Sequence, residues 1–250
     1  MPNQETAATP VPFKKTEVKY AVVADDTDAA SKLLSLVEPS TVEREIWFFD
    51  TAGRDLFAQG LILRARKTVR GSEPNDVTVK LRGDRVAAVG PERLTVVEGE
   101  AKLEGDQGGT AEARPSYSHT VERDGKVIDA VANGGAALET LFSSEQRNFL
   151  AEFMHDVTFA ALAPRGPVPA RVWDLDDGVF PHKLTAELWR VAERPLLEIS
   201  HKVDSGKAPD FATKLVTFLG EENGVRFDPI SKTEFVLERF GASAPGAAAS

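Results

Sequence analysis

The chain has 250 residues, 42% of them hydrophobic, and can bury the core of one large β domain or two ordinary domains; we expect one. Its formal net charge of −9 argues against a general affinity for nucleic acid or anionic membranes, because both require a basic surface. A site for a polyanion would therefore have to be enclosed and locally basic. The absence of cysteine excludes disulfides and thiol chemistry and fits a reducing compartment.

The two ends of the chain carry little that could be buried. Residues 1–12 are polar and lack the basic and apolar regions of a secretory signal, and residues 241–250 are almost all small. We expect both to be disordered tails that flank a single domain of residues 13–240. Because no window approaches 18 apolar residues, we expect a soluble, cytoplasmic protein without a membrane or nucleic-acid partner.

Nine segments have the composition or alternation of β-strands, and most connections between them are short. Such a series is typical of a β-barrel or a β-sandwich. The segments are residues 16–23, 43–50, 61–67, 77–82, 94–103, 170–174, 184–191, 196–203 and 235–239.

Three further segments carry the 3.6-residue periodicity of helices, and we expect them to cover a sheet. They are residues 28–37, 135–154 and 209–221. Residues 104–135 mix glycine, proline, serine and charges without a clear period. This stretch predicts a long loop with a short hairpin at Asp124 and Gly125.

The most informative feature is that one face of the predicted strands is repeatedly charged, since alternate strand residues face opposite sides of a sheet. For a single strand, a solvated polar face would explain the pattern. The charged positions are Glu17, Lys19, Arg64, Arg66, Lys80, Arg82, Glu98, Glu100, Lys102, Glu187 and Glu198.

Several such strands together favour a different interpretation. If helices cover the apolar face, the charged faces point at one another inside a closed barrel, and about eight strands can enclose a ligand. Buried charges are costly unless they are paired or liganded. The pattern therefore predicts a polar tunnel that binds a polyanion with its metal ions, and the alternative is a set of salt bridges across the lumen.

Short segments in a fixed order resemble the motifs of the CYTH superfamily, the triphosphate tunnel proteins, over most of residues 16–240. The resemblance implies an α+β, mainly β fold: a closed antiparallel barrel of roughly eight strands with a few covering helices. The segments are Lys15-Thr-Glu17-Val-Lys19, Phe48-Phe49-Asp50-Thr51, Gly60-Leu-Ile-Leu63-Arg64-Ala-Arg66, Thr78-Val-Lys80 and Ser231-Lys232.

The resemblance also implies roles for individual residues. Catalysis would involve Glu17, Lys19, Arg66 and Lys80. The triphosphate would be bound by Lys19, Arg64, Arg66, Lys80, Arg82, Arg171 and Lys232. A divalent cation, Mg²⁺ or Mn²⁺, would be held by Glu17, Glu98, Glu100, Glu187 and Glu198.

Two departures from the family pattern bear on function. Lys15 replaces the first glutamate of the opening motif, and Ser200 stands where many relatives have a glutamate. We expect a metal-dependent hydrolase of a small inorganic or organic triphosphate. An adenylyl cyclase of class IV type is the alternative enzyme, and a non-catalytic module that binds a polyanion or nucleotide is the alternative that the two departures favour.

Overall fold

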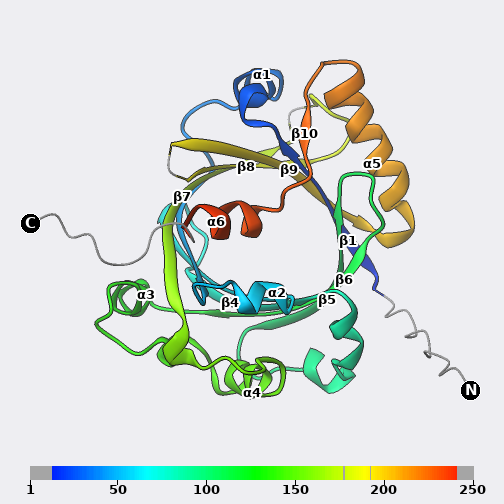
Figure 1. Ribbon diagram of the computed structural model, residues 1–250. Helices are drawn as coiled ribbons and strands as arrows, with labels where there is room; N and C mark the ends of the chain where they lie inside the picture. The colour runs from blue at the N-terminus through cyan, green and yellow to red at the C-terminus, as the bar shows by residue number, and fades with distance from the viewer. Residues whose placement is uncertain (1–12, 177, 192, 241–250) are drawn as a thin grey trace, which may run out of the picture.

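The computed structural model describes residues 13–176, 178–191 and 193–240, so both predicted tails lie outside the described residues. Within these ranges a closed ring of nine strands surrounds a central space (Figure 1). The order around the ring is β1-β5-β6-β4-β3-β2-β7-β8-β9, and pairing of β9 with β1 closes it. The short β10 adds to one edge of β1. The closed, mainly β barrel is therefore confirmed.

The bounds of the elements are as follows. The strands are β1 (Lys15–Val22), β2 (Val42–Asp50), β3 (Leu61–Arg70), β4 (Asp76–Arg82), β5 (Glu100–Gly108), β6 (Arg114–Glu122), β7 (Ala163–Leu175), β8 (Leu184–Val191), β9 (Arg194–Asp204) and β10 (Phe227–Asp228). The helices are α1 (Thr27–Leu33), α2 (Asp55–Ala58), α3 (Gly125–Ala132), α4 (Ser144–Phe153), α5 (Ala208–Val216) and α6 (Lys232–Phe240).

One pairing in the ring is parallel, between β1 and β5, with Glu17 opposite Asp106. A ring with an odd number of strands cannot alternate direction all the way round, so nine strands require one parallel pair. The expectation of a wholly antiparallel barrel is corrected on this point. The parallel pair matters for the site because it makes β1 and β5 neighbours, so that the inward-facing Glu17 and Asp106 lie next to one another.

Three predictions of local structure were wrong. Residues 235–239 form part of α6, because a short apolar run fits a buried helix as well as a strand. The strand predicted at 94–103 begins only at Glu100. The predicted long loop contains β6 and α3, and Asp124 caps α3 by accepting a hydrogen bond from the Lys126 amide.

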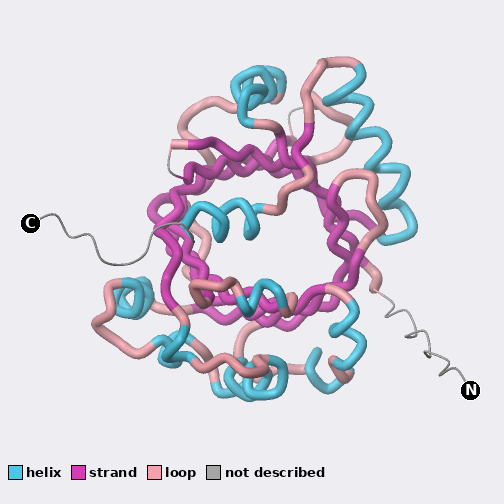
Figure 2. The backbone as a smooth tube through the Cα atoms, in the orientation of Figure 1, coloured by secondary structure: helices cyan, strands magenta, loops and turns pink. Residues whose placement is uncertain are grey.

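Helices cover the outside of the barrel on two sides, as Figure 2 shows. Helices α1 and α5 pack over the outer faces of β1, β8 and β9, with Phe211 and Leu215 buried. Helices α3 and α4 cover the opposite side, where Phe149 stacks on Tyr117 of β6. Ser143 begins α4 through a reciprocal capping box with Gln146. No helix in the described ranges is long and apolar enough to cross a membrane.

A third apolar cluster lies inside the barrel. Helix α6 runs within the ring of strands (Figure 2), and its Phe235 and Leu237 pack among inward-facing side chains that include Phe48 and Trp189. The interior is therefore filled by apolar contacts beside α6, while charged side chains line the rest. We call this charged part of the lumen the tunnel.

Gly60, in the turn before β3, lies close to the backbone at the end of β4, and a substitution there tests the importance of this contact. Its φ is +76°, and an added Cβ would lie 2.6 Å from the Arg82 carbonyl oxygen. We expect Gly60→Ala to reduce the free energy of unfolding by roughly 2 kcal/mol more than Gly134→Ala does. Gly134 is the matched control because its φ is +73° but nothing lies near its Cβ position. Urea unfolding measures both, and equal losses would show that the contact with β4 is unimportant.

Candidate functional site

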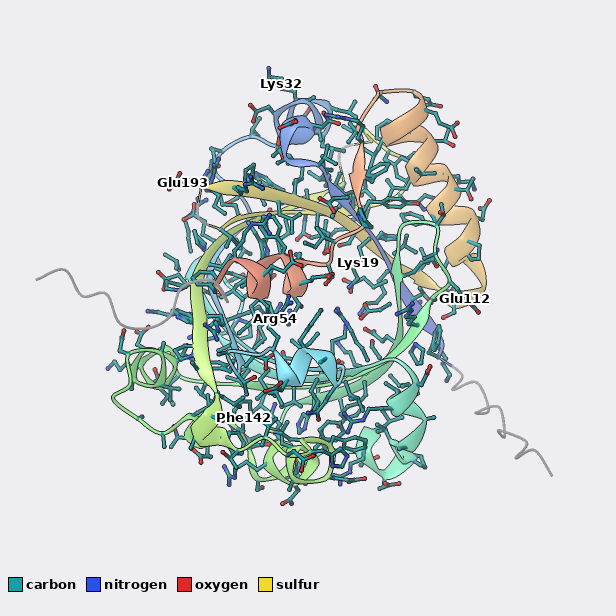
Figure 3. The ribbon with its side chains drawn as sticks, viewed as in Figure 1. Lys19, Lys32, Arg54, Glu112, Phe142 and Glu193 are labelled. Atoms are coloured by element: carbon teal, nitrogen blue, oxygen red, sulfur yellow. The ribbon has the colours of Figure 1, made fainter. Side chains whose placement is uncertain are left out.

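The barrel brings most of the predicted charged residues onto one inner surface. On neighbouring strands Arg64 is opposite Thr78, and Arg66 is opposite Asp76. Across the closing seam Lys19 of β1 is opposite Ser200 of β9. Residues opposite one another in a ladder share a face of the sheet. Figure 3 shows Lys19 projecting into the space enclosed by the strands.

A cluster of ammonium and guanidinium groups surrounds a single carboxylate, that of Asp106. The distance from Lys19 Nζ to Asp106 Oδ1 is 2.7 Å, and the distances from Lys80 Nζ and Arg82 Nε to Asp106 Oδ2 are 2.6 and 2.8 Å. Lys19 also lies 2.7 Å from a Glu17 oxygen. We call these five residues the Asp106 cluster.

Burial and neighbouring charges shift the pKa values in the Asp106 cluster in different directions. The ammonium of Lys19 holds the pKa of Glu17 well below its usual range. Burial alone would lower the pKa of Lys19, but Glu17 and Asp106 together raise it above its ordinary value. For Lys80 burial prevails and lowers the pKa to about 8, against the attraction of Asp106 and with the repulsion of Arg82 and Lys19.

Three guanidinium groups gather further along the tunnel. Arg66 makes a bidentate pair with Asp76, with its Nη2 2.7 Å from Oδ2 and its Nε 3.1 Å from Oδ1. Arg44 contacts Glu73 at the rim and lies 3.7 Å from Glu187. We call Arg44, Arg64, Arg66 and Asp76 the guanidinium cluster.

Arg64 differs from its two neighbours because, within the described ranges, no carboxylate lies within ion-pair distance of it. Its Nη2 is 3.5 Å from Thr78 Oγ1, and its buried Nε has no hydrogen-bond acceptor. Burial and the charge of Arg66 lower the pKa of Arg64 to about 10. An unpaired cation enclosed beside two others is costly, and an incoming anion would relieve that cost.

Lys232 at the start of α6 forms a third group. Its ammonium contacts Glu187 and is 2.8 Å from Glu198 Oε1, and the two glutamates are opposite one another on β8 and β9. The same ammonium lies 5.0 Å from the centre of the Trp189 ring. Burial opposes ionisation of Glu187, but Lys232 lowers the pKa of this carboxyl to about 2.

The two clusters and the Lys232 group together hold more cations than carboxylates. In these groups seven basic side chains face five acidic ones, or six with Glu73 at the rim; on the same inner faces Lys102 pairs with Glu100 and Lys202 with Glu104. The basic set is Lys19, Arg44, Arg64, Arg66, Lys80, Arg82 and Lys232, and the acidic set is Glu17, Asp76, Asp106, Glu187 and Glu198.

Two of the predicted site residues lie outside the tunnel, and a third lies at its end. Arg171 is on the outer face of β7, where it pairs with Glu38, so its expected tunnel position was wrong. The reason is the phase of β7, in which Ala170 and Val172 face inward. Glu98 lies in the turn before β5 and pairs with Arg123. Glu100 is on the inner face of β5 but 64% exposed and paired with Lys102.

The sequence pattern missed three tunnel residues. Arg44 stands between two other charges, Glu43 and Glu45, so no alternation singles it out. Asp76 directly precedes a predicted strand, and Asp106 falls in the predicted loop. The charged positions Glu100 and Lys102 lie two residues apart, and continuing this spacing through Glu104 would have identified Asp106.

The residues present do not fit a resident divalent cation. Mg²⁺ and Mn²⁺ prefer carboxylate and water oxygens in an octahedral arrangement. Every tunnel carboxylate is already within 2.8 Å of a basic group of the chain. In the described ranges no three acidic or histidine side chains are grouped so as to hold a metal ion. The Mg²⁺ or Mn²⁺ requirement stays a prediction from the resemblance.

A separate groove of about 500 Å³ lies outside the barrel, between the β5–β6 hairpin and the start of α5. Its lining is neutral apart from Glu112, which Figure 3 shows on the hairpin. The groove therefore lacks the cations that a polyanion needs, and the tunnel is the better candidate site.

Comparison with known proteins identifies the architecture. A candidate adenylyl cyclase from Hippeastrum, whose structure is described as revealing a dominant triphosphatase activity, matches with a TM-score of 0.58 and 18% identity over 93% of this chain and 98% of that one. The chain shares the fold of this protein, the closed barrel that the sequence resemblance implies. A candidate adenylate cyclase from Bacillus halodurans matches with a TM-score of 0.56 and 12% identity, covering 88% and 96% of the two chains. No protein-family model and no curated protein sequence matches this chain.

Lys80 supplies a pH-dependent prediction. Because its pKa is about 8 in the free protein, and a bound anion would raise it, binding of tripolyphosphate near pH 9 should take up protons. The affinity should fall as the pH rises through about 8. Calorimetry in two buffers of different ionisation enthalpy measures the uptake. Lys80→Gln is the control, because it leaves the protons of the ligand unchanged; equal proton uptake by both proteins would contradict the assignment.

Proposed function

We propose that the tunnel binds a small triphosphate, inorganic or organic, and hydrolyses it. The observation that carries the proposal is the buried Arg64, which lies beside Arg44 and Arg66 and has no carboxylate partner among the described residues. Cations in a structural salt-bridge network would each have a carboxylate. Arg64 has none among the described residues and faces the space where a ligand would lie.

The spacing of the cations suits a short chain of phosphates. Along β3 and β4 the basic positions alternate with outward residues, so successive cations are about 6–7 Å apart. Arginines can bind phosphate oxygens through two parallel hydrogen bonds, whereas lysines act as point charges. We assign one end of the ligand to the guanidinium cluster and the other to the Asp106 cluster.

Hydrolysis follows from charge neutralisation and positioning. Water attacks the terminal phosphorus, the bridging P–O bond breaks, the electron pair leaves on the departing phosphate oxygen, and the attacking water releases a proton to the solvent. Fixed guanidinium and ammonium groups stabilise the charge on the equatorial and leaving oxygens as it develops. Lys80 is suited to supply a proton to the leaving oxygen, because its pKa of about 8 is close to neutral.

Binding without turnover is the second candidate function. The carboxylates that would activate or orient an attacking water are engaged: Glu17 by Lys19, and Glu198 by Lys232. A tunnel whose acids only hold its bases would bind a polyanion and not process it. Cyclisation is less favoured, because Trp189 is buried beneath α6 and its ring is not open to stack on a base.

The binding site is tested by Arg64→Met. We expect this change to weaken tripolyphosphate binding about 10- to 100-fold, which corresponds to the loss of one or two charge-assisted hydrogen bonds. The free energy of unfolding should stay the same or increase, because the change removes an unpaired buried charge. Arg171→Met on the outer face is the matched control and should bind like the wild type. Equal affinity in all three proteins would exclude the tunnel as the site.

The reaction is tested by phosphate release from tripolyphosphate, ATP and thiamine triphosphate, each in Mg²⁺, Mn²⁺ or EDTA, with product identification for ATP. We expect release from at least one of them that Arg66→Ala abolishes. Cyclic AMP and pyrophosphate as products would establish a cyclase instead. Binding of these compounds with no product of either kind would establish the second candidate function.

A further inference from the structure

The places in the tunnel where carboxylates converge are occupied by ammonium groups of the chain itself. Lys232 Nζ lies between Glu187 and Glu198. Lys19 Nζ lies between Glu17 and Asp106, 2.7 Å from a carboxylate oxygen of each. A divalent cation that used either pair would have to displace the ammonium, because both groups need the same oxygen lone pairs.

Displacement would be costly because the ammonium groups are enclosed. The side chain of Lys232 is 18% exposed and that of Glu198 is 8% exposed. Lys232 opens α6, whose apolar side chains pack inside the barrel, so its backbone cannot move away freely. A displaced ammonium would remain in the tunnel without a carboxylate, which is unfavourable for an enclosed charge.

The seam between β1 and β9 shows the same replacement of acids by bases. Glu17 is directly opposite Lys202, and Lys15 and Lys19 lie two residues to either side of it on the same face. Lys15 pairs with Asp204 and Lys202 with Glu104, at 2.7 Å each. Each of the three lysines around Glu17 therefore has a carboxylate partner, and none of these carboxylates is free to bind a divalent cation.

We propose that the tunnel takes its polyanion free of divalent cations, with Lys19 and Lys232 in the positions where a metal ion would otherwise neutralise the phosphates. The inference rests on the proposed function and names the ionic form of its ligand. A magnesium complex of triphosphate carries two fewer negative charges, so it is attracted more weakly by the same cations. Divalent cations then compete with the protein for the ligand.

The first test is calorimetric titration of wild-type protein with tripolyphosphate, once in EDTA and once in excess Mg²⁺. We expect binding in EDTA that becomes several-fold weaker in Mg²⁺. Binding that appears only with Mg²⁺, or that tightens with it, would overturn the inference and leave the proposed binding function standing. No binding in either condition would overturn both.

The second test uses Mn²⁺ alone and follows its free concentration by electron paramagnetic resonance. Wild-type protein should not bind Mn²⁺ stoichiometrically. Lys232→Gln, which leaves Glu187 and Glu198 facing one another without an ammonium, should acquire one Mn²⁺ site. Arg171→Gln is the control for loss of a positive charge outside the tunnel, and it should behave as the wild type.

A stoichiometric Mn²⁺ site in the wild-type protein would overturn the inference. So would a folded Lys232→Gln variant that binds no Mn²⁺, because the vacated carboxylate pair would then not be a cation site. Thermal unfolding monitors whether the variant folds. If it does not, the wild-type titrations with Mn²⁺ and with tripolyphosphate still decide the question.

Discussion

The structure depends on one constraint: closing the sheet into a barrel turns the polar faces of its strands toward one another, away from bulk water. Each charge on those faces needs a partner, because an enclosed ion without one is costly. The chain meets this requirement for the acids, and the carboxylate of Asp106 alone contacts three basic groups. Among the described residues it leaves Arg64 without a carboxylate, and an anion could take that place.

Helix α6 links the charged and the apolar parts of the interior. Its apolar side chains fill the lumen beside β2, β7 and β8, while Lys232 in its first turn reaches the two opposed glutamates of β8 and β9. The helix is thus held at one point by ion pairs and along its length by packing.

The distribution of charge also bears on selectivity. The chain as a whole has a formal charge of −9, although the guanidinium and Asp106 clusters hold more bases than acids. The residues outside these clusters therefore carry a net negative charge, which disfavours long polyanions such as nucleic acids that need an exposed basic face. A small anion that fits inside the barrel is drawn by the local field of the guanidinium and Asp106 clusters.

The sequence by itself determined the barrel and most of the tunnel, because the alternation of charged and apolar residues in β1, β3 and β4 is a local property that a two-residue period reveals. The ordered motifs added Lys232, which no periodicity marks.

What only the tertiary structure decided depends on strand phase and on distant pairing. Arg171 proved to face outward because its neighbours on β7 face inward, and Asp106 became central only because β5 pairs in parallel with β1. The apolar segment at residues 235–239 forms a helix inside the barrel. Its short apolar run fits a helix or a strand, and the packing inside the lumen decides between them. That Lys232 and Lys19 occupy the meeting points of the carboxylates is likewise a result of three-dimensional closure, because these residues come from opposite ends of the chain.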